Sequence, residues 1–353
     1  MLGERIRSAR IMRGLSQREL ARRVGVSAMA ISKYERNLDI PGSEVLLKLA
    51  KALGVRIEFF LRSERIRGIV PAYRKRKALP RKLQASIVEQ VREWLERYVA
   101  LENLFFEDSP QFQLPEGWPR SIRNLEEVEE AAIELRQAWN LGIDPIENLA
   151  ELLEDHGIKI GVMDVQHEAF DALAFRYDGN PVIVVRRHTP GDRERFNLAH
   201  ELAHLVLAVE EDLDIERVAN RFAGAFLAPE PVVYQELGIH RKFLHPIELY
   251  LLKHKYGLSM QAWVYRARDL GIISRSTASR IFQHFRKQGW HRAEPGAPYP
   301  FEEPQRMERL VLRAVAEGLI SKGRAEELLG KSLEPLIPQV ETPYGDAAPR
   351  VRV

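Results

Sequence analysis

The chain has 353 residues, which is long enough for two or three domains, and its hydrophobic content of 45% supports buried cores. It contains no cysteine, which excludes disulfide bonds, cysteine-ligated zinc and a thiol nucleophile. The net charge of +3 is unevenly spread, because residues 1–80 hold 19 Lys and Arg against 7 Asp and Glu. A basic head on an acidic body predicts a nucleic-acid-binding module joined to a different kind of domain.

No export or membrane signal is visible in the sequence. The N-terminus has no apolar signal core, and no apolar run reaches the roughly 18 residues of a membrane span. We therefore expect a cytoplasmic protein with no membrane partner.

The first 63 residues, which we call the head, show the pattern of a cluster of short helices. Gly25 ends a helix over 17–24, and Ser27 caps a second helix over 28–36. Two short helices joined by a Gly-x-Ser turn predict a helix-turn-helix, whose second helix enters the major groove of DNA.

Three segments of this head carry a family resemblance: LSQRELA at 15–21, VGVS at 24–27 and ISKYER at 31–36. They resemble the Xre (lambda-repressor-like) DNA-binding domain. The resemblance implies that double-stranded DNA is contacted by Gln17, Ser27, Ala28, Met29, Ser32, Lys33 and Arg36. Because one small module rarely binds DNA tightly enough, we expect a homodimer on a pseudo-palindromic operator.

Residues 64–120 are predicted to be a linker followed by one long helix over 81–107. The basic run RKRK at 74–77 either extends the phosphate contact or is a solvated charge run. An apolar stripe along the helix indicates packing or self-association, so the helix is also a candidate dimer contact.

Residues 121–232 are predicted to form a core that contains both helices and strands. Its elements in chain order are helices over 124–141 and 144–157, strands over 158–163, 172–177 and 181–186, and a further helix that Thr189 caps and Pro190 opens. With helical segments on both sides, this order predicts an α+β, mostly helical protein.

The last helix of this core contains the motif His200-Glu-Leu-Ala-His204. Residues four apart share one face of a helix, so both imidazoles point at one place. Two neutral imidazoles suit Zn²⁺, which in catalytic sites takes three protein ligands and keeps one position for water. The carboxylate of Glu201, next to the first histidine, can reach that water and act as general base. We therefore expect one zinc per chain.

A third ligand must come from outside the motif. Glu216 begins a segment of helical periodicity over 216–229. A helix packed against the motif helix could present this carboxylate to the metal, which would give a His₂Glu site. Four nearby acidic residues are rival ligands: Glu210, Glu211, Asp212 and Asp214.

Two segments of this region closely resemble the ImmA/IrrE family of zinc metallopeptidases: PGDRERFNLAHELAH at 190–204 and ERVANRFA at 216–223. The resemblance implies three zinc ligands and one general base, namely His200, His204, Glu216 and Glu201. It also implies an endopeptidase that cleaves a repressor-type protein in response to a stress or phage-related signal. Asn220 and Asp214 are candidates for holding the second nitrogen of a histidine.

The remaining residues are predicted to be helical. Residues 233–292 form an appendage with a helix-turn-helix-like unit over 246–270, and residues 293–353 form a helical cap and tail. The predicted architecture is an N-terminal all-α helix-turn-helix domain, a zincin-like core with a small sheet and the motif helix, and a C-terminal helical appendage.

The sequence supports two functions of different kinds. The first is a DNA-binding transcriptional regulator with a zinc-dependent endopeptidase domain. The alternative is a non-catalytic Xre-type repressor, or a toxin–antitoxin component, whose peptidase fold serves as a sensor. The presence of Glu201 favours the enzyme, because structural zinc sites need no base and have four protein ligands.

Overall fold

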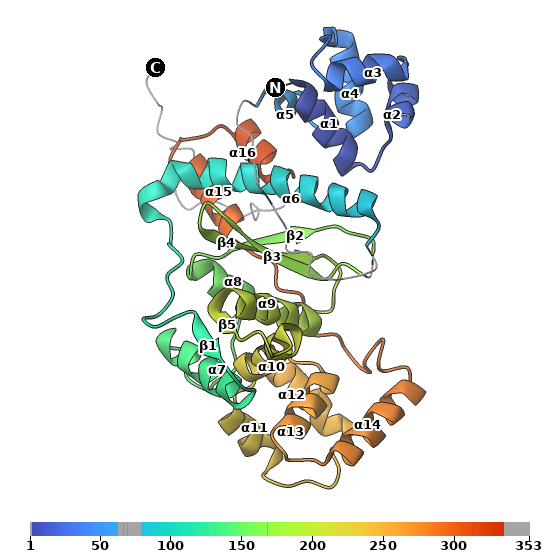
Figure 1. The fold of residues 1–353 in the computed structure, drawn as a ribbon. Coiled ribbons are helices and arrows are strands. Elements are labelled where there is room, and N and C mark those ends of the chain that lie inside the picture. Colours follow the sequence, from blue (N-terminus) through green and yellow to red (C-terminus); the bar gives the residue numbers. More distant parts are fainter. Residues whose placement is uncertain (1, 63–65, 67–68, 70–78, 168, 335–353) are drawn as a thin grey trace.

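The computed structural model describes residues 2–62, 66, 69, 79–167 and 169–334. It is mostly helical with two small sheets, so the predicted α+β class is confirmed. Figure 1 shows a helical head at the top, a layer with the larger sheet below it, and a helical lower part. The basic run at 74–77 and the C-terminal tail from 335 lie outside the described residues. Within the described part, no helix combines the length and apolarity needed to cross a bilayer.

The head is built from short helices, as predicted, and also from one that was not anticipated. They are α1 (Leu2–Met12), α2 (Gln17–Val24), α3 (Ala28–Glu35), α4 (Ser43–Leu53) and the unanticipated α5 (Ile57–Leu61). The Ser16 hydroxyl accepts from the Glu19 N–H at 3.2 Å, while the Glu19 carboxylate accepts from the Ser16 N–H at 2.6 Å. This reciprocal cap starts α2, and left-handed Gly25 ends it.

The long helix α6 (Arg81–Glu102) is shorter than predicted. Phe105 has non-helical backbone angles (φ −128°, ψ 35°), so the chain continues as the 3₁₀ segment η1 (Asn103–Asp108). The apolar stripe of α6 is buried against the larger sheet of the same chain, through Ile87, Val91, Trp94, Leu95 and Tyr98. The stripe therefore serves packing, and it is not exposed for the dimer contact considered from the sequence.

The larger sheet has the strand order β2-β4-β3. β2 (Lys159–Met163) runs parallel to β4 (Asn180–Arg186), and β3 (Ala172–Tyr177) pairs antiparallel with β4. One face of the sheet packs against α6, and the other packs against α8 (Leu149–Asp155) and α9 (Gly191–Val206) (Figure 1). β3 is an edge strand, because no other described strand pairs with its outer side.

A second, two-stranded sheet was not anticipated. β1 (Arg120–Ile122) runs parallel to β5 (Leu207–Val209), which directly follows α9. This pairing ties the connection after α6 to the C-terminal end of the motif helix.

The N-terminus of α9 differs from the prediction. Pro190, and not Thr189, occupies the N-cap position, and the Thr189 hydroxyl donates to the Arg186 carbonyl at 2.9 Å. The Gly191 N–H donates to the Tyr299 carbonyl at 3.0 Å, so a segment far along the chain satisfies this helix end.

The lower part of the molecule is helical, and the chain then returns upward. α10 (Ile215–Leu227) packs along α9 and α7 (Glu126–Ala138), and it is followed by α11 (Glu230–Leu237), α12 (Pro246–Tyr256), α13 (Met260–Asp269) and α14 (Arg275–Lys287). Residues 295–305, which we call the return segment, cross the N-terminus of α9. α15 (Arg306–Ala316) and α16 (Lys322–Leu329) then pack beside α6 (Figure 1).

Candidate functional sites

Helix α9 brings the two motif histidines together on one face. Their Nε2 atoms lie 3.3 Å apart, and the exposed fractions of the two side chains are 9% for His200 and 19% for His204. The opposite face of α9 is fixed in the core by Leu198, Leu202 and Val206, which are fully buried. The imidazoles therefore have a defined direction, as the four-residue spacing predicts.

The first turn of α10 adds a carboxylate to this pair. Glu216 lies 3.3 Å from the His200 Nε2 and 3.7 Å from the His204 Nε2. Asp214, one of the rival ligands, instead caps α10 by accepting from the Glu216 and Arg217 N–H groups at 3.0 and 3.3 Å. The other rivals, Glu210, Glu211 and Asp212, are not part of the cluster, whose ligand atoms all lie within 4.8 Å of one another.

One of the two residues named for holding a histidine does so in the structure. The Asn220 Oδ1 lies 3.0 Å from the His200 Nδ1. An amide oxygen only accepts hydrogen bonds, so this contact assigns the proton to Nδ1 and leaves the Nε2 lone pair for a metal. Two imidazole nitrogens and a carboxylate oxygen, oriented in this way, form a donor set that fits zinc.

A cavity of about 430 Å³ lies beside these side chains. Glu201 lines it together with residues of the edge strand β3. Most of the other walls are apolar, including Phe170, Leu173, Phe175, Leu205, Leu207 and Ile215. The cavity has space for a substrate side chain next to the candidate general base.

Arg176 of β3 also lines the cavity, and sequence reasoning missed it. Its guanidinium donates to the Gly179 carbonyl at 3.0 Å and to the Leu205 carbonyl at 3.5 Å, and no carboxylate pairs with it within the described residues. An arginine near the end of a strand usually indicates a solvated side chain, so the sequence carries no signal that places it at a cavity.

Two residues of α9 with ionisable side chains, Glu194 and Arg195, are fully buried. Arg195 pairs with Glu302 of the return segment and donates to the Ile146 carbonyl at 2.8 Å. The Glu194 Oε2 accepts from the Glu302 N–H at 2.8 Å, and burial raises the pKa of the Glu194 carboxyl to about 9. Glu194 is therefore protonated at neutral pH, and these contacts fix the first half of the motif helix.

The residues predicted to contact DNA lie on and around α3. The exposed ones are Ser27, Met29, Lys33 and Arg36, and the half-buried ones are Gln17, Ala28 and Ser32. Ser27 caps α3 by accepting from the Ala30 N–H at 3.0 Å. The Gln17 side chain donates to the Glu35 carboxylate at 2.8 Å, so in this conformation its amide contacts the head itself.

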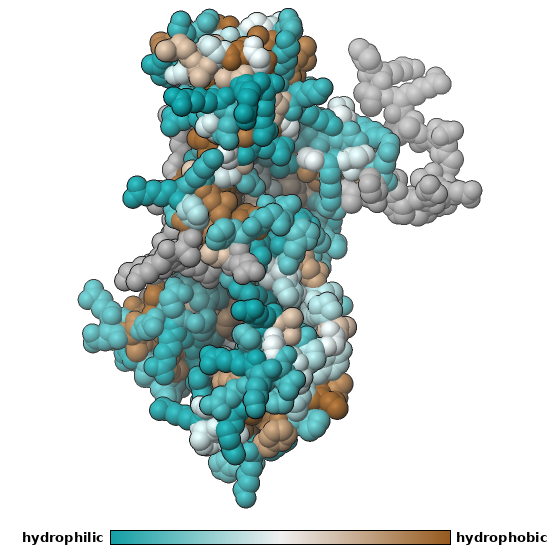
Figure 2. All heavy atoms as spheres, turned by 90° about the vertical axis from the view of Figure 1, so that its right-hand side faces the viewer, coloured by the Kyte–Doolittle hydropathy of each residue, from teal (hydrophilic) through white to brown (hydrophobic). Residues whose placement is uncertain are grey.

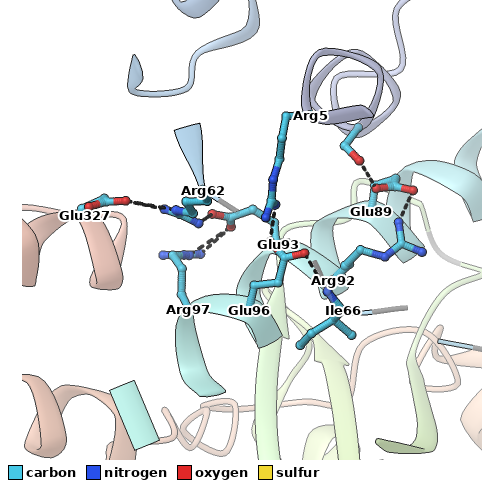
Figure 3. A network of polar contacts seen from close by, with 10 residues as sticks. Arg5, Arg62, Ile66, Glu89, Arg92, Glu93, Glu96, Arg97 and Glu327 are labelled. Atoms are coloured by element: carbon cyan, nitrogen blue, oxygen red, sulfur yellow. Dashed lines mark hydrogen bonds and ion pairs between the residues drawn. The ribbon is translucent and has the colours of Figure 1, made fainter. Parts of the chain in front are cut away.

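Polar contacts attach the head to α6 (Figure 3). Arg5 of α1 pairs with Glu96, and both side chains are nearly buried, with exposed fractions of 4% and 6%. The Ser8 hydroxyl donates to Glu89 at 2.5 Å, and Arg62 contacts Glu93 at 3.2 Å. The contacts use α1 and the end of the head, whereas α3 lies farther from α6 (Figure 1).

Comparison with known proteins identifies two regions of the chain. Residues 6–60 match a helix-turn-helix family, and residues 153–268 match the IrrE N-terminal-like domain of a peptidase family. The chain joins a helix-turn-helix domain to an IrrE-like peptidase domain. The IrrE-like domain therefore includes the motif helix α9, the cluster with Glu216 and the edge strand β3.

Three curated relatives are similar over short segments. A transcriptional regulator in the ATPase CF(0) region of Rhodospirillum rubrum is 44% identical over 17% of this chain and 55% of its own length. Repressor protein C2 of Salmonella phage P22 is 41% identical over 18% of this chain and 30% of its own. The SPbeta prophage-derived regulator YonR of Bacillus subtilis is 36% identical over 18% of this chain and 57% of its own length. The chain thus spans between 30% and 57% of the length of these relatives.

Proposed function

We propose that the chain is a DNA-binding transcriptional regulator whose IrrE-like domain is a zinc-dependent endopeptidase. The observation that carries the proposal is the cluster of His200, His204 and Glu216, with ligand atoms within 4.8 Å of one another, beside the cavity that Glu201 lines. Three protein ligands leave a position for water, which is the pattern of catalytic zinc sites.

The residues of the site have distinct roles in peptide hydrolysis. Bound zinc would supply a Lewis acid that lowers the pKa of water toward neutrality and polarises the peptide carbonyl. The Glu201 carboxylate accepts the proton of the attacking water and passes it to the leaving amine. Asn220 holds His200 in the tautomer that ligation requires.

The edge strand β3 supports a peptide as the substrate. An extended segment can add to the outer side of such a strand through backbone hydrogen bonds, and β3 lines the cavity next to Glu201. Arg176 on this strand favours a substrate with an acidic side chain near the cleaved bond. We propose a repressor-type protein, cleaved after a stress or phage-related signal, because the head would hold the peptidase on DNA where such a protein binds.

The head supports DNA binding through α3. Lys33 and Arg36 are exposed there, on a domain with a large excess of basic residues. We propose that two copies bind the two halves of a pseudo-palindromic operator. Because the apolar stripe of α6 is buried, the contact between the copies uses another surface.

Elemental analysis tests the metal centre. We expect about one zinc per chain in the wild type and loss of zinc in His204→Ala and Glu216→Ala. Glu211→Ala is the matched control, because this exposed glutamate lies outside the cluster. A wild-type protein that takes up no zinc when zinc is added back would remove the enzyme proposal.

Cleavage is tested by comparing new protein N-termini in cells that express the wild type or Glu201→Gln. The proposal expects new N-termini from a DNA-binding repressor with the wild type only. The same set from both proteins, with DNA binding retained, would favour the alternative of a regulator whose peptidase fold serves as a sensor.

A further inference from the structure

Two helices in the lower part of the molecule, α13 and α14, are joined by a short turn. Between α13 and α14, Gly271 is left-handed (φ 73°), and Ser274 caps α14 by accepting a backbone N–H at 3.1 Å. In the head, left-handed Gly25 (φ 80°) and the capping Ser27 lie in the turn between α2 and α3, which is two residues shorter than the turn between α13 and α14. The helix-turn-helix-like unit predicted at 246–270 is present as α12, left-handed Gly257 and α13, which Ser259 caps, and α14 follows it as a further helix.

α14 has one buried face and one exposed face. The buried face packs into the core through Thr277, Ala278, Ile281 and Phe285. The exposed face is polar and consists of Arg275, Ser276, Ser279, Arg280, Gln283, His284, Arg286 and Lys287. Because the buried face fixes the helix, the exposed side chains have a defined orientation, as a helix that contacts DNA requires.

Within the part of the chain that the structure describes, the cations of this exposed face have no carboxylate partners. No Asp or Glu occurs in the sequence between Asp269 and Glu294. These two flanking acids are engaged with other cations: Asp269 pairs with Arg268 at 2.6 Å, and Glu294 pairs with Lys253 at 3.1 Å. Among the described residues, no ion pair joins the exposed face of α14 to an acidic side chain. This face therefore keeps its full positive charge.

We propose that α14 is a second DNA-contacting helix, which binds the phosphates of double-stranded DNA through Arg275, Arg280 and Arg286. Unpaired arginines on one helix face complement the phosphate backbone, and Ser279 and Gln283 add donors for phosphate or base edges. The proposal goes beyond the proposed function, which assigns DNA binding to the head alone.

The position of α14 allows one chain to engage DNA at two places. In Figure 1, α14 at the lower right and α2 and α3 at the upper right lie toward the same side of the molecule. Figure 2 views that side, and its lower end is largely hydrophilic. α3 and α14 are thus separated along the molecule and lie toward the same side of it.

The salt dependence of DNA binding tests the proposal. The probe is a duplex of mixed sequence, titrated with the full chain and with the triple variant Arg275→Gln, Arg280→Gln and Arg286→Gln. Each phosphate contact contributes about 0.9 to the slope of log affinity against log salt, so the variant should lose about 2 to 3 of that slope. Its affinity near 0.1 M salt should fall at least about tenfold.

A matched control distinguishes the contribution of α14 to DNA binding from the effect of the net charge. The triple variant Arg187→Gln, Arg309→Gln and Arg313→Gln removes the same charge from exposed arginines, but each of these pairs with a carboxylate. We expect its slope to stay at the wild-type value. Equal losses in both variants, or no loss in the α14 variant, would overturn the proposal.

A third variant distinguishes the contribution of α14 to DNA binding from that of the head. With Lys33→Gln and Arg36→Gln in the head, DNA binding should remain measurable and should fall again when the α14 substitutions are added. Complete loss from the head substitutions alone would overturn the proposal. A photo-cross-linker at Gln283 should join the duplex, and a cross-link to an acidic protein in its place would assign this face to a different partner.

Discussion

The side-chain amide of Asn220 controls the orientation of His200, the first histidine of the metal-binding motif. Asn220 accepts from the His200 Nδ1 at 3.0 Å, and partners of this kind raise metal affinity by holding the ring and its tautomer. We expect Asn220→Ala to weaken zinc binding by about 10- to 100-fold. Asn220→Asp keeps an acceptor and should retain most of the affinity. Competition against a chromophoric chelator measures both values, and equal affinities for wild type and Asn220→Ala would refute this role.

Glu194 gives the fold a pH dependence of predictable sign. Its carboxyl has a pKa of about 9 in the folded chain and an ordinary value of 4.5 without burial. Between these values the folded state binds more protons than the unfolded state, so the free energy of unfolding falls as the pH rises. Burial leaves the Glu194 Oε1 without a hydrogen-bond partner among the described residues, which agrees with a neutral carboxyl.

The variant Glu194→Gln tests this dependence. It keeps an acceptor for the Glu302 N–H but cannot ionise, so between pH 7 and 9 its free energy of unfolding should fall by about 2 kcal/mol less than that of the wild type. Urea denaturation at several pH values measures the difference. Parallel pH curves for the two proteins would show that Glu194 is already ionised at neutral pH.

Single residues differ in how far the sequence reveals their roles. The four-residue spacing of His200 and His204 is a local pattern, so it could be predicted before the structure was known. The cavity position of Arg176 could not be predicted, because it depends on the C-terminal end of α9. The burial of Glu194 could not be predicted either, because it depends on the return segment, about a hundred residues further along the chain.

At the scale of elements, the return segment closes the N-terminus of the motif helix. A Cβ at Gly191 would lie 1.8 Å from the Pro300 carbonyl oxygen, which is a backbone atom and cannot move aside alone. We expect Gly191→Ala to displace the return segment and to lower the free energy of unfolding by about 2 kcal/mol or more. Gly323→Ala in α16 is the control, since a Cβ there meets open space and should stabilise by up to about 1 kcal/mol. Thermal denaturation should separate the two variants.

Elements with a long periodic pattern were predictable, and short or context-dependent ones were not. The strands β3 and β4 and the helices α12 and α13 lie close to their predicted ranges, because each carries its own alternation or cap. β1 and β5 have three residues each, too few for a pattern, and they are strands only because they meet. The end of α6 was missed because the backbone of Phe105 departs from the helix while the apolar periodicity continues.

At the scale of the whole molecule, α6 joins the head to the IrrE-like domain. Its buried stripe packs on the sheet, and its acidic side chains hold the head, as Figure 3 shows. We expect Glu96→Ala to remove the buried carboxylate that pairs with Arg5, which weakens this attachment by up to about 3 kcal/mol. Differential scanning calorimetry should then resolve a separate transition of the head at lower temperature.

A double variant provides the control for this attachment. Replacing both charges by apolar side chains, as in Arg5→Met with Glu96→Leu, removes the buried arginine together with the carboxylate, so the single cooperative transition should return. If Glu96→Ala alone melts like the wild type, the ion pair does not hold the head.

The absence of cysteine gives the proposed centre a distinctive sensitivity. Thiolate ligands release zinc when peroxide oxidises them, whereas two imidazoles and a carboxylate have no such chemistry. The same imidazoles must be neutral to bind zinc, so acidification competes with the metal for His200 and His204. A centre of this composition therefore responds to zinc supply and to acid, and it keeps its metal under oxidants that would inactivate a cysteine-based site.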